Sequence, residues 1–168
     1  MDAERAGRLV AELGTRVVVG PPMPLAGAAH SLRWARAAVR QIEAGILPAV
    51  PVTWCAEHLT TLWLLSDEEL MEQLARHQLA PLAEFPDRTR LRLGDTLLAW
   101  LENGGKVQKI ADELSVHPQT VRYRLRQLEQ VFGERLHDPE ARFAMEAVLR
   151  ATEIRRTALD AAMAGGRS

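Results

Sequence analysis

The sequence predicts a mainly α-helical protein, with a small α/β region near the amino terminus and an all-helical region at the carboxyl terminus. Three observations support this fold class. Hydrophobic residues make up 47% of the 168 residues, which is typical of a chain with a packed core. The two segments with strand character both end before Cys55. Beyond that residue, apolar side chains recur at helical spacing between breaks rich in glycine and proline.

The first region, residues 1–66, is predicted as a partial α/β domain. Its segments alternate between helical and strand patterns: 5–13 (helix), 16–20 (strand), 25–43 (helix) and 50–54 (strand). Pro51 cannot donate to a ladder, so the second strand should lie at a sheet edge. The longer helix shows one apolar stripe, made of Leu32, Ala35, Val39 and Ile42.

The remaining chain is predicted to be helical throughout. Residues 67–87 are expected to form a helical linker. Ser66, just before it, and Glu69 have the spacing of a capping box at the helix start. Residues 88–162 should form a separate helical domain. Its elements are a helix over 89–102, two short helices over 107–126 and a last helix over 139–162, whose inner face should contain Phe143, Ala147, Ala151, Ile154 and Ala158. Residues 163–168 are expected to be a tail.

The segment 107–126 has the pattern of a helix-turn-helix. Ala111 is the small residue needed where the first helix crosses the second, and Pro118 occupies a first helical position, where its missing N–H costs nothing. Ser115 stands where such turns often have glycine, so it must either avoid or tolerate a positive φ. The inward-facing residues are predicted to be Ile110, Leu114, Val116, Val121, Leu125 and Leu128.

The second of these helices has a polar outer face. At about 100° per residue, Gln119, Arg122, Tyr123 and Arg126 lie opposite its apolar side. Guanidinium and amide groups bond guanine and adenine bidentately in the major groove, so these four residues are predicted to contact bases. Lys106, Thr120 and Arg124 are predicted to contact phosphates. The expected partner is double-stranded DNA, bound by a homodimer, because a single motif binds weakly.

A family resemblance follows from these residues. The stretch 93–149 resembles the C-terminal DNA-binding domain of PucR/CdaR-type bacterial transcription regulators. The matching landmarks are Thr96-Leu97, Asn103-Gly104-Gly105, Ala111, Leu114, His117, Thr120 to Leu125, Gly133 and Asp138-Pro139. The resemblance implies a sequence-specific DNA-binding transcriptional regulator. Residues 17–20 and 31–37 resemble, more weakly, the last β-α-β portion of the GGDEF-like domain of these regulators. The chain contains no GGDEF string, so no cyclase activity is expected.

Charge and composition limit the other function classes. Residues 1–87 contain 7 basic and 11 acidic side chains, net −4, and residues 88–168 contain 14 basic and 11 acidic side chains, net +3. The basic carboxyl-terminal half favours phosphate contact. No apolar run approaches the roughly 20 residues that span a bilayer. The amino terminus lacks a secretory pattern, and Cys55 is the single cysteine. These features favour a cytoplasmic protein without membrane contact.

Enzyme chemistry and a regulatory binding module are the two alternatives to DNA binding. Cys55 and His58 lie one helical turn apart, a spacing that could suit a catalytic cysteine activated by a histidine. A lone cysteine beside a histidine is far more often a packed core residue. The five histidines show no metal-ligand spacing, and no phosphate or dinucleotide loop is present. No enzyme activity, metal or cofactor is therefore expected. The open alternative is a regulatory module, in which the first region binds a small-molecule effector or a protein and the helix-turn-helix serves protein contacts.

Overall fold

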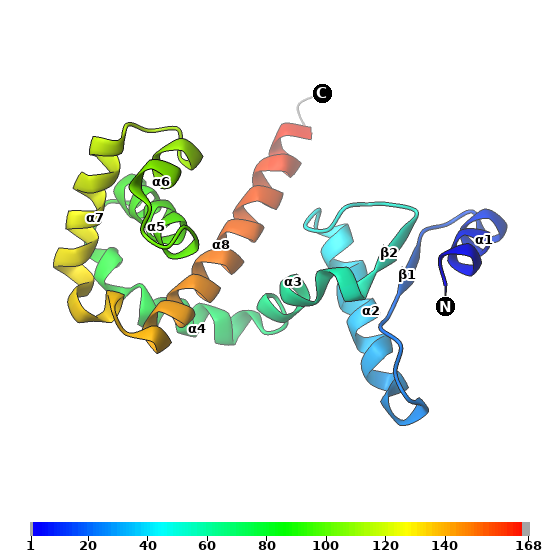
Figure 1. Ribbon diagram of the computed structural model, residues 1–168. Helices are drawn as coiled ribbons and strands as arrows, with labels where there is room; N and C mark the ends of the chain where they lie inside the picture. The colour runs from blue at the N-terminus through cyan, green and yellow to red at the C-terminus, as the bar shows by residue number, and fades with distance from the viewer. Residues whose placement is uncertain (1, 166–168) are drawn as a thin grey trace. The chain divides into compact units, whose positions relative to one another are not determined.

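The computed structural model describes residues 2–165 and confirms the mainly helical fold class (Figure 1). These residues form eight α-helices, four short 3-10 helices and a two-stranded sheet. They divide into two compact units. The first contains the residues up to Ser66 and those from Glu153 onward, and the second contains Asp67–Thr152.

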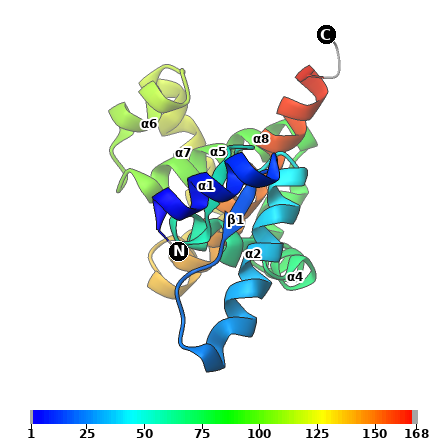
Figure 2. The ribbon, with the colours of Figure 1, turned by 90° about the vertical axis from the view of Figure 1, so that its right-hand side faces the viewer.

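The first unit is a β-α-β arrangement with an additional helix at each end. Its main elements are α1 (Ala3–Leu13), β1 (Val17–Val19), α2 (Ala28–Glu43), β2 (Val52–Trp54) and α3 (Leu59–Leu64). The strands pair in parallel, with Val17 opposite Val52. Parallel strands need a crossover connection, which α2 provides. Figure 2 brings α1, β1 and α2 toward the viewer.

The core of the first unit is small. Its buried members are Ala38, Leu47, Cys55 and Leu62. Ala35 and Ile42 pack against this core as predicted, but Leu32 is 53% exposed and Val39 is 39% exposed. The predicted apolar stripe is therefore wrong for these two residues. A sheet of two strands covers only a narrow strip of α2, so half of the stripe lies outside the core.

The starts of α2 and α4 (Glu68–Gln78) differ from prediction. Residues Leu25–Gly27 form a 3-10 turn, so α2 begins at Ala28. The cap of α4 (Glu68–Gln78) is Asp67, whose carboxylate accepts from the Leu70 N–H at 2.9 Å. The Ser66 hydroxyl instead donates to the Trp63 carbonyl at 2.8 Å. Ser66 thus serves the end of α3, and the neighbouring aspartate is an equally good cap.

The second unit has the larger core. Its long helices are α4, α5 (Asp87–Glu102), α7 (Pro118–Phe132) and the first part of α8 (Pro139–Gly165), with the short α6 (Val107–Glu113) between them. Leu82, from the segment 67–87, is 1% exposed and belongs to this core with Leu93 and Leu97. The segment predicted as a linker is therefore packed into the unit, because its apolar side chains fill the space beside α5 and α7.

The last helix, α8, is longer than predicted, and its buried residues differ in part from the predicted ones. Asp138 caps α8 by accepting from the Ala141 N–H at 2.8 Å, and the helix continues to Gly165. The predicted tail 163–168 is thus helical to 165, and its remainder lies outside the described residues. Phe143 is 62% exposed, whereas Met145 and Val148 are buried. Ala147, Ala151 and Ala158 are buried as predicted.

Candidate nucleic-acid interface

Helices α5, α6 and α7 pack around a common cluster (Figure 1). Its buried residues are Ala99, Ile110, Ala111 and Val121. Val107, Leu114, Val116 and Leu125 pack against it while partly exposed. Leu128, further along α7, is buried in the larger core of the unit. The inward residues predicted for the helix-turn-helix are confirmed, and α7 is held by its apolar back.

The turn between α6 and α7 is a Schellman motif. The Val116 N–H donates to the Ala111 carbonyl at 2.9 Å, and the Ser115 N–H donates to the Asp112 carbonyl at 3.2 Å. Ser115 has φ +52°, which makes it the one non-glycine residue at positive φ within the described chain. Of the two possibilities expected for Ser115, avoiding or tolerating a positive φ, the structure shows the second. Glycine adopts this conformation at lower cost, so the turn stores some strain.

The first turn of α7 is fixed by a histidine cap. The His117 Nδ1 accepts a hydrogen bond from the Gln119 N–H at 3.1 Å, and Pro118 is the first helical residue, as predicted. The sequence had marked His117 as a landmark without assigning it this role. The cap orders the backbone that presents Gln119.

The turn between α5 and α6 is held by Asn103 and two glycines. The Asn103 amide donates to the Ala99 carbonyl at 2.8 Å and to a Glu113 carboxylate oxygen at 2.7 Å, which joins the ends of both helices. Gly104 and Gly105 have φ of 57° and 79°. A Cβ at Gly105 would lie 3.3 Å from the Trp100 Nε1. The turn therefore sets where Lys106, at the start of α6, emerges.

The outer face of α7 combines the four predicted base-contacting residues. Gln119, Arg122, Tyr123 and Arg126 are all exposed, Tyr123 at 58%. The Arg126 Nε donates to the Arg122 carbonyl at 3.4 Å, which lays the guanidinium along the helix. From Lys106 to Arg126 the chain has five basic and two acidic side chains, a net charge of +3. The structure thus presents a polar, basic helix face to solvent.

The three predicted phosphate-contacting residues are in different surroundings. Lys106 is exposed and Thr120 is half-buried. Arg124 is also half-buried, and its Nη1 donates to the Thr96 hydroxyl on α5 at 3.2 Å. The sequence interpretation missed this contact, because the two residues lie 28 positions apart and the Thr96 hydroxyl also bonds within its own helix, to the Arg92 carbonyl. It also omitted Lys109, which is exposed on α6.

Helix α8 supports α5 from another side. The Arg142 guanidinium lies over the Trp100 ring, 4.8 Å from its centroid. Arg150 forms ion pairs with Glu102 and Glu146, each at 2.9 Å. These contacts fix the carboxyl-terminal half of α5, on which α6 and α7 pack. Helix α7 therefore packs on a helix, α5, that is itself contacted by α8.

The structure also bears on the Cys55 thiol, on metal binding and on membrane spans. Cys55 is buried, and desolvation raises the pKa of its thiol, which disfavours the nucleophilic thiolate. Within residues 2–165, no group of three histidine, cysteine, aspartate or glutamate side chains could hold a metal ion. None of the helices in that range is long and apolar enough to cross a membrane.

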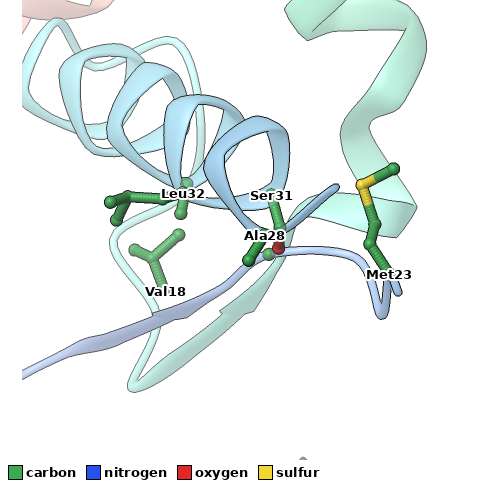
Figure 3. A pocket seen from close by; sticks show the side chains of 7 residues that line it. Val18, Met23, Ala28, Ser31 and Leu32 are labelled. Atoms are coloured by element: carbon green, nitrogen blue, oxygen red, sulfur yellow. The ribbon is translucent and has the colours of Figure 1, made fainter. Parts of the chain in front are cut away.

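A shallow pocket lies in the first unit, beside β1 and the start of α2 (Figure 3). Its volume is about 330 Å³. Its walls come mainly from the apolar residues Val18, Met23, Ala28, Leu32 and Ala35, with Gly20 and Ser31. The Ser31 hydroxyl already donates to the Pro21 carbonyl at 2.8 Å. The pocket has no charged group among its lining residues to orient a ligand.

Comparison with known proteins finds a known domain at the segment that contains the helix-turn-helix. Residues 93–151 match the PucR C-terminal helix-turn-helix domain. Uncharacterized proteins of Mycobacterium tuberculosis and Mycobacterium bovis are each 32% identical to this chain over 117 residues, which is 70% of the chain and 27% of each relative. An uncharacterized protein of the pkwA 5′ region of Thermomonospora curvata is 42% identical over 71 residues, 42% of the chain and 39% of that relative. The chain spans about a quarter of the length of the mycobacterial relatives.

Proposed function

We propose that this chain, which carries a PucR-type C-terminal helix-turn-helix domain at residues 93–151, is a sequence-specific DNA-binding regulator of transcription. The observation that best supports the proposal is the outer face of α7, where Gln119, Arg122, Tyr123 and Arg126 are exposed together. This face begins in the first turn of the helix, which is the part of such a helix that usually enters the major groove.

Each of these side chains has a defined chemical role in the proposal. Arg122 and Arg126 would donate bidentately to guanine O6 and N7, and Gln119 would bond adenine N6 and N7. Tyr123 offers a ring edge and a hydroxyl to the neighbouring base. Direct contacts of this kind distinguish one base pair from another, because the major groove presents a different donor and acceptor pattern for each.

Phosphate contacts would hold the helix in register. Lys106, exposed at the start of α6, and Thr120, on the flank of α7, are the two residues best placed for this role. Arg124 is less well placed than either, because its guanidinium already donates to Thr96. Contacts with phosphates release counterions, so binding should weaken steeply as the salt concentration rises.

Selection of DNA fragments by the purified chain tests the proposal. The wild-type chain should enrich a defined sequence, and Arg122→Ala should lower affinity for it by about 1–3 kcal/mol and relax the preference at one position. Arg76→Ala, which removes an exposed arginine from α4, is the matched control and should change neither quantity. An Arg122→Ala chain with unchanged affinity and preference would refute the assignment of this face to the groove.

We further propose that the regulator binds as a homodimer. One helix-turn-helix contacts few base pairs, and dimers of such proteins bind half-sites about 34–36 Å apart, one turn of DNA. The selected sequence should therefore contain two related half-sites. Sedimentation of the chain on that DNA should show two protomers per site, and one protomer per site would exclude the dimer.

The alternative is a regulatory module in which the first unit binds an effector or a partner. The pocket beside β1 is the observation in its favour. Its walls lack charged residues, so it would suit an apolar ligand rather than an ionic one. Under this alternative the purified chain would enrich no DNA sequence, and Leu32→Asp at the pocket wall would abolish effector or partner binding. The DNA selection therefore separates the two functions.

A further inference from the structure

We propose that Arg124 is a positioning residue, which fixes the rotation of α7 on α5 through Thr96 and so decides which side chains face the DNA. The inference rests on the proposed function, because it concerns the geometry of the same helix. It assigns to Arg124 a role inside the protein, in place of a direct phosphate contact.

The first support is the environment of Thr96. This residue is fully buried, at 0% exposed, in the middle of α5. Its Oγ1 donates to the Arg92 carbonyl at 2.7 Å and accepts from the Arg124 Nη1 at 3.2 Å. A buried hydroxyl without partners is costly, and a charged donor makes a stronger bond than a neutral one. Thr96 is therefore a specific acceptor on α5 for the arginine of α7.

The second support is the direction of Arg124 on its helix. Residues of an α-helix are about 100° apart, so Arg124, two positions from both Arg122 and Arg126, points roughly 160° away from each of them. Arg122 and Arg126 are exposed, whereas Arg124 is half-buried. A side chain on that side of α7 is poorly directed for the groove that the other two would enter.

The contact of Arg124 with Thr96 restricts the rotation of α7 about its own axis, which apolar packing restricts only weakly. Val121 and Leu128 hold the helix against its neighbours, but apolar contacts are weakly directional and tolerate small rotations. Bidentate base contacts require orientation within roughly 10–20°. A hydrogen bond to a buried point on α5 restricts that rotation. Its loss should therefore reduce sequence preference more than general DNA affinity.

A double-mutant cycle tests this role. Affinities for the selected sequence and for unrelated DNA are measured at several salt concentrations for Thr96→Val, Arg124→Met and the double variant. Each single change should lower affinity for the selected sequence by about five- to tenfold. Affinity for unrelated DNA and the salt dependence should stay unchanged. The double variant should be no worse than either single variant, because both remove the same contact.

Two control variants separate the hydrogen bond from packing and from helix effects. Thr96→Ser keeps the hydroxyl and should keep the sequence preference. Thr152→Val removes a hydroxyl that donates to the Val148 carbonyl at 2.8 Å in the same way, from an exposed position on α8, and should have no effect. Equal losses in Thr96→Ser and Thr96→Val would show that packing alone matters and would overturn the proposal.

A phosphate contact predicts a different pattern. In that case Arg124→Met would weaken binding to both DNAs alike and reduce the salt slope by about one counterion, while Thr96→Val would change nothing. This result would overturn the positioning role and leave the proposed function standing. A wild-type chain that prefers no sequence would overturn both, so the two failures are distinguishable.

Discussion

The two units of the chain bury their apolar side chains to very different extents. Of the eleven largest fully buried side chains among the described residues, nine lie in the second unit and two, Thr53 and Cys55, lie in the first. Of the fourteen exposed large hydrophobic residues within positions 2–165, ten lie in the first unit. The unit with the proposed DNA contacts therefore has a well-filled core, whereas the α/β unit is held by a thin one.

The largest expected effect comes from truncating the same residue type in each unit. Leu97 is 0% exposed and Leu32 is 53% exposed, and both lie in long helices. Leu97→Ala should lower the free energy of unfolding by about 2–5 kcal/mol, because it leaves a cavity in the core. Leu32→Ala should change it by less than about 0.5 kcal/mol. Urea unfolding followed by circular dichroism measures both, and equal losses would refute the difference in packing.

A glycine substitution tests whether the thin unit can be disturbed alone. A Cβ at Gly20 would lie 2.6 Å from the Ser31 carbonyl oxygen, whereas a Cβ at Gly7 on α1 would meet nothing within 4 Å. Gly20→Ala should therefore destabilise the first unit by about 1–3 kcal/mol through overpacking.

Amide hydrogen exchange measures the stability of each unit separately in the Gly20→Ala variant. Exchange of β1 and β2 should accelerate in Gly20→Ala, and exchange of α5 and α7 should not change. Gly7→Ala, the matched control, should slow exchange in α1, because alanine favours a helix more than glycine does. Acceleration across α5 and α7 in Gly20→Ala would show that the units do not unfold separately.

A smaller change in stability is expected from the strained turn before α7, in the well-packed unit. Ser115 has φ +52°, a conformation that costs an L-residue about 1–2 kcal/mol and a β-branched residue more than most. Ser115→Val should lower the melting temperature, and Ser115→Gly should maintain or raise it. A melting temperature that falls equally in both variants would mean that the serine side chain, rather than φ, stabilises the turn.

The smallest expected effect is a pH dependence confined to the first unit. Burial raises the pKa of the Cys55 thiol above its ordinary value of 9.0. The unfolded chain therefore loses this proton first, and the stabilising contribution declines as pH rises above about 9. Cys55→Ala should show a weaker decline in stability between pH 8 and pH 10.5 than the wild type. Identical pH profiles would show that the thiol titrates alike in both states.

The sequence predicted the helix-turn-helix in detail because its signals are local. Helical spacing determined the buried positions of Ile110, Val121 and Leu128, and turn chemistry identified Ser115 and Pro118. The capping residue was missed by one position, because Ser66 and Asp67 are both good caps and the choice depends on the end of α3. Local signals thus locate elements well and fail where two neighbours compete for one role.

Packing between elements was harder to predict. Leu32 and Phe143 have the right spacing for a buried face, but which stripe of a helix is covered depends on the neighbours that pack on it. The contact of Arg124 with Thr96 joins residues 28 positions apart, so no local sequence pattern predicts it. The polar face of α7 was predictable because it needs no partner within the chain.

We propose that the exposed face of α7 contacts bases. The most direct test of this proposal is the affinity of the purified wild-type chain and of the double variant Arg122→Ala, Arg126→Ala for the selected sequence and for unrelated DNA, by fluorescence anisotropy. We expect a strong preference in the wild type and none in the double variant, with helical content and melting temperature unchanged. A double variant that keeps the wild-type preference would contradict it.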